Sequence, residues 1–451
     1  MRFTDRGNEL EMLENAVKRK KSMIIIYGRR RVGKTALIKK FIENKDSIYI
    51  YIPLQSEKSL LRYLAESLYR YTGNPLLKSP FPSFRDFMDY IVNERKLIVL
   101  DEFQRLEKIE GAISIIQDVW DSSEEMRIVL TGSSIDMIHH LALSGDSPLF
   151  GRRTLEIKLK PFKPEVVFSL AGSVKKGIEI YAVFGGTPAY LENIDWKRGI
   201  MYNIETLIIR KGMPLYSEPE YLIRSETRDA STYLSILRYI SLGKQSLGEL
   251  SDILGMERNK VSFYLSVLEK EMDIIRKDVP VTEDPKKSRK GRYRISDPFF
   301  NFWFRYVFHY ENELEMGRTG YVLDIIKKDL QGYVGRIAED VIRGIIRENP
   351  EYAGYRVGSW WNRRGDEIDI VALNEKKKEI LFGEVKWRNR PIGCSIIDEV
   401  MEKKDLVKWH NEDRKEKFLV VSKSGFTKKC IERMDSEGIM HWDLRDVERM
   451  I

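Results

Sequence analysis

The chain has 451 residues, a formal net charge of +8 and a sequence pI near 9.0, so it exceeds one typical hydrophobic core and admits nucleic acid as a partner. Its two cysteines, Cys394 and Cys430, exclude a disulfide framework and a four-cysteine zinc site. It shows no apolar leader and no uncharged stretch of about 18 residues, so we expect a cytoplasmic protein of about two to four domains without a membrane partner.

The first informative element is a glycine-containing loop between an apolar run at 23–27 and a helical pattern that extends through Phe41. It fits the spacing G-x-x-x-x-G-K-[ST] with Gly28, Arg29, Arg30, Arg31, Val32, Gly33, Lys34 and Thr35. Glycines let backbone N–H groups curl around an anion, Lys34 can reach the β- and γ-phosphates, and the Thr35 hydroxyl suits Mg²⁺. We therefore predict that these eight residues bind ATP, that Lys34 also serves catalysis, and that Thr35 holds the metal.

The next element is a strand pattern at Leu97–Asp101 that ends in two acids, Asp101 and Glu102. P-loop NTPases place a carboxylate at such a strand end to hold the metal. Asp101 is predicted to hold Mg²⁺ through water, and Glu102 to act as the catalytic group that polarises the attacking water. This pair favours a hydrolase over a passive nucleotide binder, and a strand-ending turn is the alternative.

Short apolar strands alternate with helical patterns over residues 1–160. The expected strands are Met23–Tyr27, Ser47–Ile52, Leu97–Asp101, Arg127–Thr131 and Leu155–Leu159. Helical connections between strands predict a parallel sheet covered on both faces. The pattern resembles the additional-strand class of P-loop ATPases, which implies that strand 97–101 lies beside 127–131 and that 127–131 lies beside 23–27. Thr131-Gly132-Ser133-Ser134 then lies near the γ-phosphate, where it either resembles a sensor-1 element or caps a helix.

The sequence pattern changes twice in the middle of the chain. Residues 161–230 are helical in pattern and are predicted to form a lid packed on the nucleotide domain. Residues 231–296 show three helices and then a basic hairpin, the order of a winged helix. Residues 286–294 hold six cations and no acid, which suits contact with nucleic acid phosphates; an ordinary solvated loop is the alternative.

The last part, 297–451, opens with an aromatic run from Phe299 to Tyr310 that we predict to be a buried helix. Two strand patterns follow at 367–372 and 380–387. If these strands pair, Asp369 lies opposite Glu384 and Lys386, which project from one face because they are two residues apart. Inward-facing acids are costly as core, and binding of a hard cation resolves that cost.

This order of Asp369, Glu384 and Lys386 resembles the restriction-endonuclease core, written D…(D/E)-x-K. The resemblance implies that Asp369 and Glu384, with Glu339 on the preceding helix, hold Mg²⁺ for catalysis of phosphodiester hydrolysis. It also implies that Lys386 supports the nucleophile or the phosphate charge. A degenerate nuclease fold kept as a binding module and a solvated sheet face are the alternatives.

Further motifs accompany these, at Phe3-Thr4-Asp5-Arg6, Gly151-Arg152-Arg153, Gly185-Gly186-Thr187-Pro188, Asp297-Pro298 and Trp360-Trp361-Asn362-Arg363. With them the chain resembles the archaeal-type P-loop ATPases, relatives of the signal-transduction ATPases with numerous domains, which often carry a C-terminal restriction-endonuclease-like domain. The resemblance implies that Arg6 lies near the adenine or ribose and that Arg152 or Arg153 approaches phosphates of this chain or a neighbour. Structural pairing is the alternative for these arginines. We can place no sensor-2 arginine, so a ring or another homo-oligomer stays open.

We therefore expect an α/β protein with four parts. These are a P-loop ATPase domain (1–160), a helical lid (161–230), a winged helix (231–296), and an aromatic helix with a restriction-endonuclease-like α/β domain (297–451). The predicted function is an ATP- and Mg²⁺-dependent ATPase coupled to a winged helix that binds nucleic acid, DNA favoured, and to a metal-dependent nuclease. The alternative is an ATP-dependent regulatory or signalling switch whose C-terminal domain is catalytically dead and binds DNA or protein.

Overall fold

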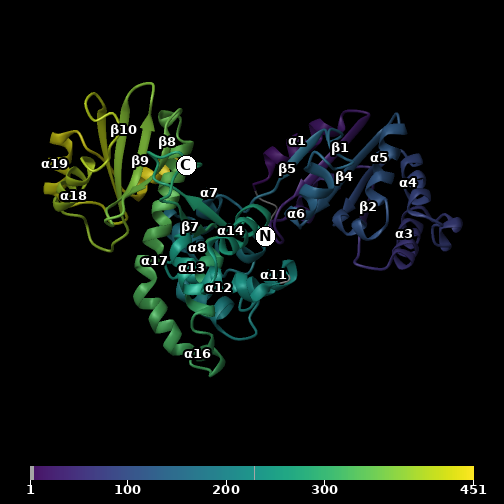
Figure 1. Cartoon of the computed structure of the whole chain (residues 1–451), viewed down its shortest axis with the longest axis horizontal. Coiled ribbons are helices and arrows are strands. Elements are labelled where there is room, and N and C mark those ends of the chain that lie inside the picture. The colour runs from purple at the N-terminus through teal and green to yellow at the C-terminus, as the bar shows by residue number, and fades with distance from the viewer. Residues whose placement is uncertain (1–4, 228) are drawn as a thin grey trace. The chain divides into compact units, whose positions relative to one another are not determined.

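A computed structural model describes residues 5–227 and 229–451, and the chain divides into two compact units (Figure 1). The first contains the residues up to Phe162 together with Thr187–Glu192 and Lys270–Met272, and the second contains the others. The motif residues Phe3 and Thr4 lie outside the described residues. The four predicted domain boundaries stay a prediction, and each unit is described by itself below.

The first unit is built on a sheet of five parallel strands in the order β2-β3-β4-β1-β5. Their bounds are β1 (Lys21–Tyr27), β2 (Ser47–Tyr51), β3 (Leu97–Asp101), β4 (Met126–Gly132) and β5 (Leu155–Lys158). The register sets Asp101 beside Thr131, and Tyr27 beside Gly132. The predicted neighbours are therefore confirmed, and the carboxyl ends of β3, β4 and β1 meet at one edge.

Helices cover both faces of this sheet because successive side chains of a strand point to opposite sides. Met23 and Ile25 of β1 join a core with α3, α4 and α5, whereas Ile24 and Ile26 join a core with α1 and α2. The helices of this unit are α1 (Gly7–Val17), α2 (Lys34–Ile42), α3 (Glu57–Thr72), α4 (Phe84–Asn93), α5 (Ala112–Ser122), α6 (Ile135–Ile138) and α9 (Pro188–Leu191). The predicted doubly covered parallel sheet is confirmed.

The segment predicted as a lid is helical, but only residues 187–192 group with the nucleotide unit. Its other helices are α7 (Pro164–Ala171), α8 (Val174–Phe184), α10 (Ile200–Asn203) and α11 (Glu218–Glu226). Helix α8 packs on α7 and also on α15 (Pro298–Trp303) and α17 (Thr319–Glu348) of the second unit. Helix α8 therefore packs within the second unit, and the lid predicted for residues 161–230 stays a prediction.

Three helices and a two-stranded antiparallel ribbon follow in the predicted order. They are α12 (Ala230–Ser241), α13 (Leu247–Leu254), α14 (Arg258–Ser266), β6 (Ile275–Asp278) and β7 (Arg292–Ile295). Ser246 and Glu249 form a capping box that starts α13, and Gly255, with a φ of 61°, ends it. The elements fit a winged helix, and that assignment itself stays a prediction.

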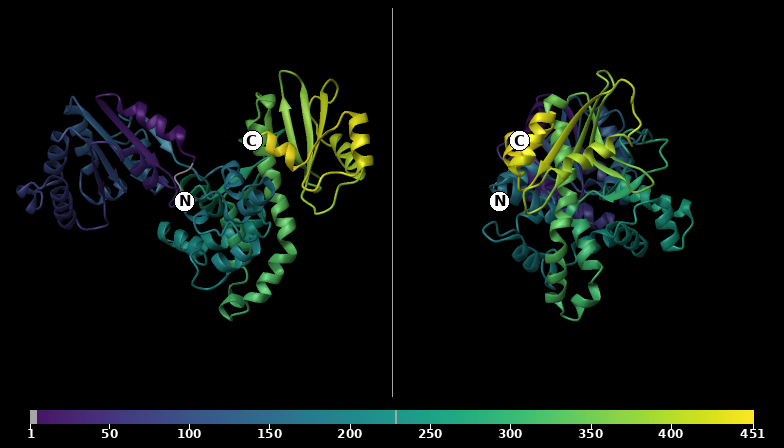
Figure 2. Two further views of the ribbon diagram at one scale, coloured as in Figure 1. Left: turned by 180° about the vertical axis from the view of Figure 1, so that it is seen from behind. Right: turned by 90° about the vertical axis from the view of Figure 1, so that its left-hand side faces the viewer.

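The C-terminal part holds a mixed sheet in the order β12-β11-β10-β9-β8. Its elements are β8 (Arg356–Trp361), β9 (Glu367–Asn374), β10 (Glu379–Lys386), α18 (Ser395–Lys404), β11 (Lys415–Ser422), α19 (Lys428–Glu437), β12 (Met440–Trp442) and α20 (Leu444–Arg449). Strands β9 and β10 pair, which is the condition set for bringing Asp369 to Glu384, and they run antiparallel. The long helix α17, green in Figure 2, contacts β8, β9 and β10.

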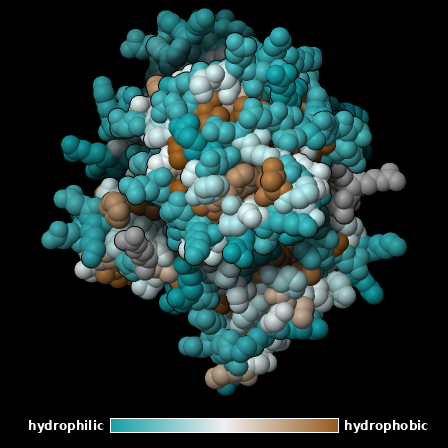
Figure 3. Space-filling model, turned by 90° about the vertical axis from the view of Figure 1, so that its right-hand side faces the viewer, coloured by the Kyte–Doolittle hydropathy of each residue, from teal (hydrophilic) through white to brown (hydrophobic). Residues whose placement is uncertain are grey.

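The aromatic run is buried, as predicted: Phe299, Phe300 and Phe302 of α15 are fully enclosed. Across residues 5–227 and 229–451, no helix is long and apolar enough to cross a bilayer. Figure 3 shows one face of the molecule, where hydrophilic residues predominate and hydrophobic ones gather in small patches. Such patches are ordinary for a folded chain.

Candidate functional site

The glycine loop joins β1 to α2 in a tight curve that depends on two glycines. A methyl group on Gly28 would lie 2.2 Å from the carbonyl oxygen of Leu159, and Gly33 adopts a φ of 95°. Lys34 is buried, and its ammonium donates to the carbonyls of Gly28 (2.7 Å) and Arg29 (2.9 Å). The loop therefore brings its amides, the start of α2 and the lysine together, an arrangement suited to polyphosphate.

The predicted metal-binding pair lies together at the carboxyl end of β3. Thr35 Oγ1 donates to Asp101 Oδ2 at 3.1 Å, and the Tyr49 hydroxyl donates to the same oxygen at 2.6 Å. Burial, and then the hydrogen bond to Asp101, raise the pKa of Tyr49 well above its usual range, so the tyrosine stays a donor. The oxygens of Thr35 and Asp101 fit Mg²⁺, which prefers a few protein oxygens beside phosphate and water. Tyr49 was not predicted, because its role depends on β2 lying beside β3.

Glu102 follows directly, with a left-handed φ of 60°. Its Oε2 accepts from Gln104 Nε2 at 2.6 Å and from Ser133 Oγ at 2.9 Å, so two neutral donors orient the carboxylate. Ser134 takes the N-cap position of α6, as the capping alternative expects, but its side chain makes no capping hydrogen bond. The contact from Ser133 agrees with the sensor-1-like placement of 131–134, whereas Gln104 was not foreseen.

The arginines implied by the resemblance make structural contacts. Arg6 is buried, donates to the carbonyls of Val32 (3.2 Å) and Lys160 (2.7 Å), and lies 4.8 Å from the ring centre of Phe162. Arg6 therefore links the glycine loop to the chain that follows β5. A contact of Arg6 with adenine or ribose stays a prediction.

Arg152 and Arg153 precede β5 and so lie at the amino edge of the sheet, opposite the loop that follows β1. Arg152 Nη2 lies 2.7 Å from Asp121 Oδ2, and Arg153 Nε lies 3.1 Å from Glu156 Oε2. The structural alternative describes both contacts. Glu156 also accepts from the hydroxyl of Tyr27, the residue before Gly28, so an approach of Arg152 or Arg153 to phosphates of this chain or a neighbour stays a prediction.

The C-terminal residues converge as the predicted strand pairing requires. The paired register of β9 and β10 ends with Gly383 opposite Ile370, and its continuation by one residue sets Asp369 opposite Glu384. Asp369 Oδ2 accepts from the backbone N–H of Val385 at 2.9 Å. Glu384 is 2% exposed, and its carboxylate contacts Lys386 Nζ at 3.1 Å and Lys403 Nζ at 2.6 Å. Lys403 was not predicted, since only the packing of α18 brings it to β10.

The acids of this cluster titrate abnormally. Burial, and then the charges of Glu339 and Glu384, raise the pKa of Asp369 to about 9, and burial raises that of Glu339 to about 7. Burial would also raise the pKa of Glu384, but its hydrogen bond with Asp369 and its lysine neighbours lower it below the usual value. A hard cation would relieve this crowding of acids, because carboxylate oxygens are ligands that Mg²⁺ and Mn²⁺ prefer. In residues 5–227 and 229–451, no three His, Cys, Asp or Glu side chains are grouped closely enough to hold a metal, so ligation by Glu339, Asp369 and Glu384 stays a prediction.

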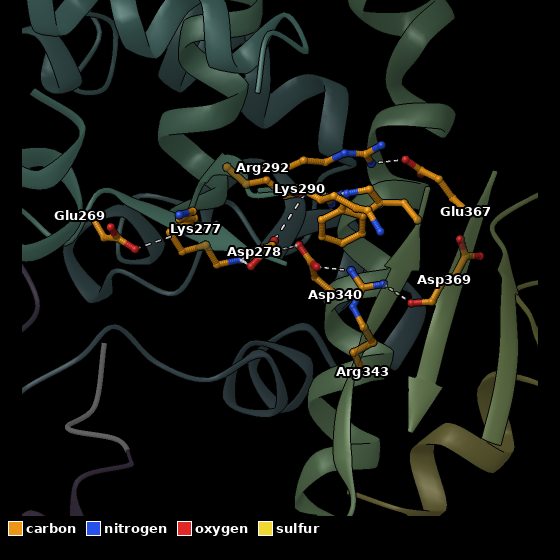
Figure 4. Close-up of polar contacts among 12 residues, drawn as sticks. Glu269, Lys277, Asp278, Lys290, Arg292, Asp340, Arg343, Glu367 and Asp369 are labelled. Carbon is orange, nitrogen blue, oxygen red and sulfur yellow. Dashed lines mark hydrogen bonds and ion pairs between the residues drawn. The ribbon is translucent and has the colours of Figure 1, made fainter. Parts of the chain in front are cut away.

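The basic ribbon is partly neutralised by its own unit. Lys290 pairs with Glu283 at 2.5 Å, Arg294 lies 3.5 Å from Asp278, and Arg292 pairs with Glu367 of β9 (Figure 4). The other three cations of the run, Lys286, Lys287 and Arg289, are exposed. Half of the charge predicted to face nucleic acid therefore faces acids instead.

The parallel sheet, the glycine loop and the acids at the end of β3 define a P-loop ATPase. Residues 3–194 match a family described as an ATPase domain predominantly from Archaea, and residues 303–405 match one described as archaea bacterial proteins of unknown function. The chain is 33% identical over 403 residues to an uncharacterized protein of Methanocaldococcus jannaschii, a match that covers 86% of this chain and 88% of that protein. The chain therefore belongs to this family of archaeal-type P-loop ATPases with a second, C-terminal family domain.

Two further likenesses agree with the nucleotide-binding fold. A Walker-type ATPase of Pyrococcus abyssi superimposes with a TM-score of 0.52 at 21% identity, over 67% of this chain and 96% of that one. A stretch of 44 residues is 61% identical to an uncharacterized ATP-binding protein of M. jannaschii, covering 10% of this chain and 75% of that protein. The first likeness shows the fold alone.

Proposed function

We propose that the protein hydrolyses ATP in its first unit and, in its second, binds DNA through the winged-helix region and cuts it at the Asp369–Glu384 pair. Membership of an archaeal ATPase family supports the first part. The observation that carries the second is the pairing of Asp369 with Glu384 beside two lysines on one sheet.

In the ATPase site, the loop amides and Lys34 bind the β- and γ-phosphates. Thr35 and Asp101 hold Mg²⁺, which when bound neutralises phosphate charge. Glu102 orients the attacking water and accepts a hydrogen bond from one of the water protons. Gln104 and Ser133 hold the Glu102 carboxylate in position. The water oxygen bonds to the γ-phosphorus while the bond to the β-phosphate oxygen breaks, so ADP and phosphate leave.

In the nuclease-like site, Asp369 and Glu384 would hold the divalent metal, which when bound supplies charge neutralisation and an activated water. The ammonium of Lys386 is fixed beside the carboxylates and stabilises charge that develops on the phosphate. The attacking water gives one proton to solvent as its oxygen bonds to the phosphorus, one phosphorus–oxygen ester bond breaks, and the leaving oxygen takes one proton from solvent.

The test is a cleavage assay in which metal and ATP are varied independently. Purified full-length protein is incubated with linear, circular and single-stranded DNA and with RNA, in Mg²⁺, Mn²⁺ or chelator. We expect metal-dependent cutting that Asp369→Ala and Lys386→Ala abolish, with ATPase activity unchanged in both variants. If no substrate is cut with either metal, with or without ATP, the nuclease part fails.

A second candidate is an ATP-dependent switch whose C-terminal domain binds DNA or protein without cutting. It is favoured by one contact pattern: Lys386 and Lys403 already neutralise Glu384, which lets the sheet stand without a metal. DNA binding without cleavage in the same assay would support this candidate.

A further inference from the structure

A groove runs along the predicted cleavage site, between α17 and the chain that leaves β10. One hollow of about 430 Å³ is lined by Gln331, Gly332, Gly335, Arg336 and Glu339 of α17 and by residues 385–389. A second hollow of about 410 Å³ shares Lys386, Arg388 and Asn389 with the first and extends along residues 390–393 and 395–396 to Glu399. Because Lys386 and Arg388 line both, we treat the two hollows as one feature, the α17–β10 groove.

The groove carries cations that the protein does not use internally. Arg336, Arg388 and Arg390 are exposed, and within the described residues no ion pair joins any of them to a carboxylate. The ribbon differs, since Lys290, Arg292 and Arg294 each face an acid (Figure 4). Free guanidinium groups beside amides such as Gln331 and Asn389 suit phosphate and sugar oxygens.

The shape of the groove depends on two glycines of α17. A methyl group on Gly335 would lie 3.3 Å from Trp387 Cβ, so this glycine lets helix and strand end approach closely. Gly332 has only Asp329 Oδ1 within 4 Å of such a methyl group, at 3.9 Å, so it leaves the floor open. A glycine inside a helix lowers stability by about 0.5–1 kcal/mol relative to alanine. We take the space that Gly332 leaves for a ligand to offset this loss.

We propose that a strand of DNA lies in the α17–β10 groove, with its phosphates on Arg336, Arg388 and Arg390, and that this groove supplies more of the phosphate contact than the ribbon does. The inference rests on the proposed function, because it takes Lys386 and Glu339 to mark the cleavage site. A strand held there passes directly beside Lys386, which lines both hollows.

The experiment compares two triple variants of the full chain that remove the same charge. The groove variant is Arg336→Ala, Arg388→Ala and Arg390→Ala, and the matched ribbon variant is Lys286→Ala, Lys287→Ala and Arg289→Ala. Binding of a labelled duplex and of a labelled single strand is measured in chelator across a salt series. The groove variant should bind at least about tenfold more weakly near 0.1 M salt and lose about 2–3 units of log–log salt slope, whereas the ribbon variant should lose less than about one.

Equal losses in the two variants would show a general charge effect and overturn the groove, as would an unchanged slope in the groove variant. Gly332→Gln gives a test without charge: it favours the helix, so the melting temperature should hold or rise while DNA binding weakens. Wild-type binding by that variant would also overturn the proposal.

The groove and the nuclease proposal can fail separately. If wild-type protein cuts nothing but the groove variant loses its salt slope, the groove stands and the nuclease fails. If wild-type protein cuts and the groove variant keeps the wild-type KM, the nuclease stands and the groove fails.

Discussion

At the scale of single residues, Glu102, the proposed catalytic group, shows how the fold orients a carboxylate. Its left-handed backbone is uncommon for a residue with a side chain, and its carboxylate is held by donors from two different segments. Strain of this kind persists where the surroundings over-determine it, often at functional sites. We infer that Gln104 and Ser133 fix the carboxylate in the orientation that water activation needs.

Two substitutions in the ATP site should separate binding from turnover. Lys34→Ala removes the ammonium beside the loop, so ATP binding itself should nearly vanish in calorimetry. Glu102→Gln keeps the shape and the loop, so binding should persist while hydrolysis falls by about 10²-fold or more. Normal hydrolysis in the Glu102→Gln variant would remove this residue from the catalytic role.

Gly132 offers a test of how Glu102 is positioned. A methyl group there would lie 2.1 Å from Gln104 Oε1 and 2.6 Å from Ile138 Cδ1, so Gly132→Ala must displace the amide that supports Glu102. We expect the kcat of ATP hydrolysis to fall roughly tenfold or more with a smaller change in the KM for ATP. Gly145→Ala is the matched control, because nothing lies within 4 Å of the added methyl group. Equal kcat values in both variants would contradict the role of Gln104.

At the scale of elements, patterns that are local in sequence proved predictable and contacts that depend on packing did not. The strand ending in Asp101 and the alternation that sets Glu384 and Lys386 on one face follow from periodicity and spacing. Lys403 reaches Glu384 only because α18 packs on β10, and α8 joins α15 and α17 for reasons that no short stretch carries. These are long-range choices among apolar faces, which a single sequence does not rank.

The Asp369 cluster should make stability depend on pH. The pKa of Asp369 is about 9 in the folded protein against an ordinary value of 3.8, so between these pH values the native state binds a proton that the unfolded chain has lost. Its contribution is therefore fully present below about pH 4 and is lost as the pH rises toward 9. In chelator, Asp369→Asn should gain unfolding free energy relative to wild type between pH 5 and pH 9, measured by denaturant titration.

Mn²⁺ supplies the control for this pH effect. The metal should stabilise the wild type and leave the Asp369→Asn variant unchanged, since only the wild type offers both carboxylates. A difference between the two proteins that stays constant across pH would show that Asp369 keeps its ordinary pKa.

Helix α17 is fixed to the ribbon and to β9 through Asp340. This carboxylate accepts from Arg276 Nη2 at 2.8 Å and from Arg343, which also donates to the carbonyl of Asp369. Burial would raise the pKa of Asp340, but the two arginines outweigh it and hold the pKa well below its usual range. Asp340→Asn should therefore lower the unfolding free energy at neutral pH by about 3 kcal/mol, the lower end for a broken buried pair because the side chain is 27% exposed.

Asp324→Asn, on the exposed side of the same helix, is the matched control for Asp340 and should cost less than about 0.5 kcal/mol. Chemical denaturation of both variants measures the difference. Similar values for the two would show that the contacts around Asp340 contribute no more to stability than those of an exposed aspartate.

At the scale of the whole molecule, the two proposed chemistries lie in different units, whereas the parts that we propose to contact DNA lie in one unit. The ribbon, α17 and β9 are joined by contacts of Arg276, Asp340, Arg343 and Asp369 (Figure 4). A force applied to the ribbon by bound DNA therefore reaches the strand that carries Asp369 through hydrogen-bonded groups. Among the described residues, none of the nucleotide site takes part in these contacts.

This division predicts how the two activities uncouple. Asp369→Asn should abolish cleavage and leave the rate of ATP hydrolysis without DNA within about twofold of wild type, because the ATP site lies entirely in the first unit. Lys34→Ala should do the reverse: metal-dependent cleavage of accessible single-stranded DNA should persist, while any stimulation by ATP is lost. Both rates are measured on the same preparations: the release of phosphate from ATP and the cutting of DNA are followed in parallel. Loss of both activities in either variant, with the fold intact by circular dichroism, would mean that the units act as one catalytic body and would contradict the division.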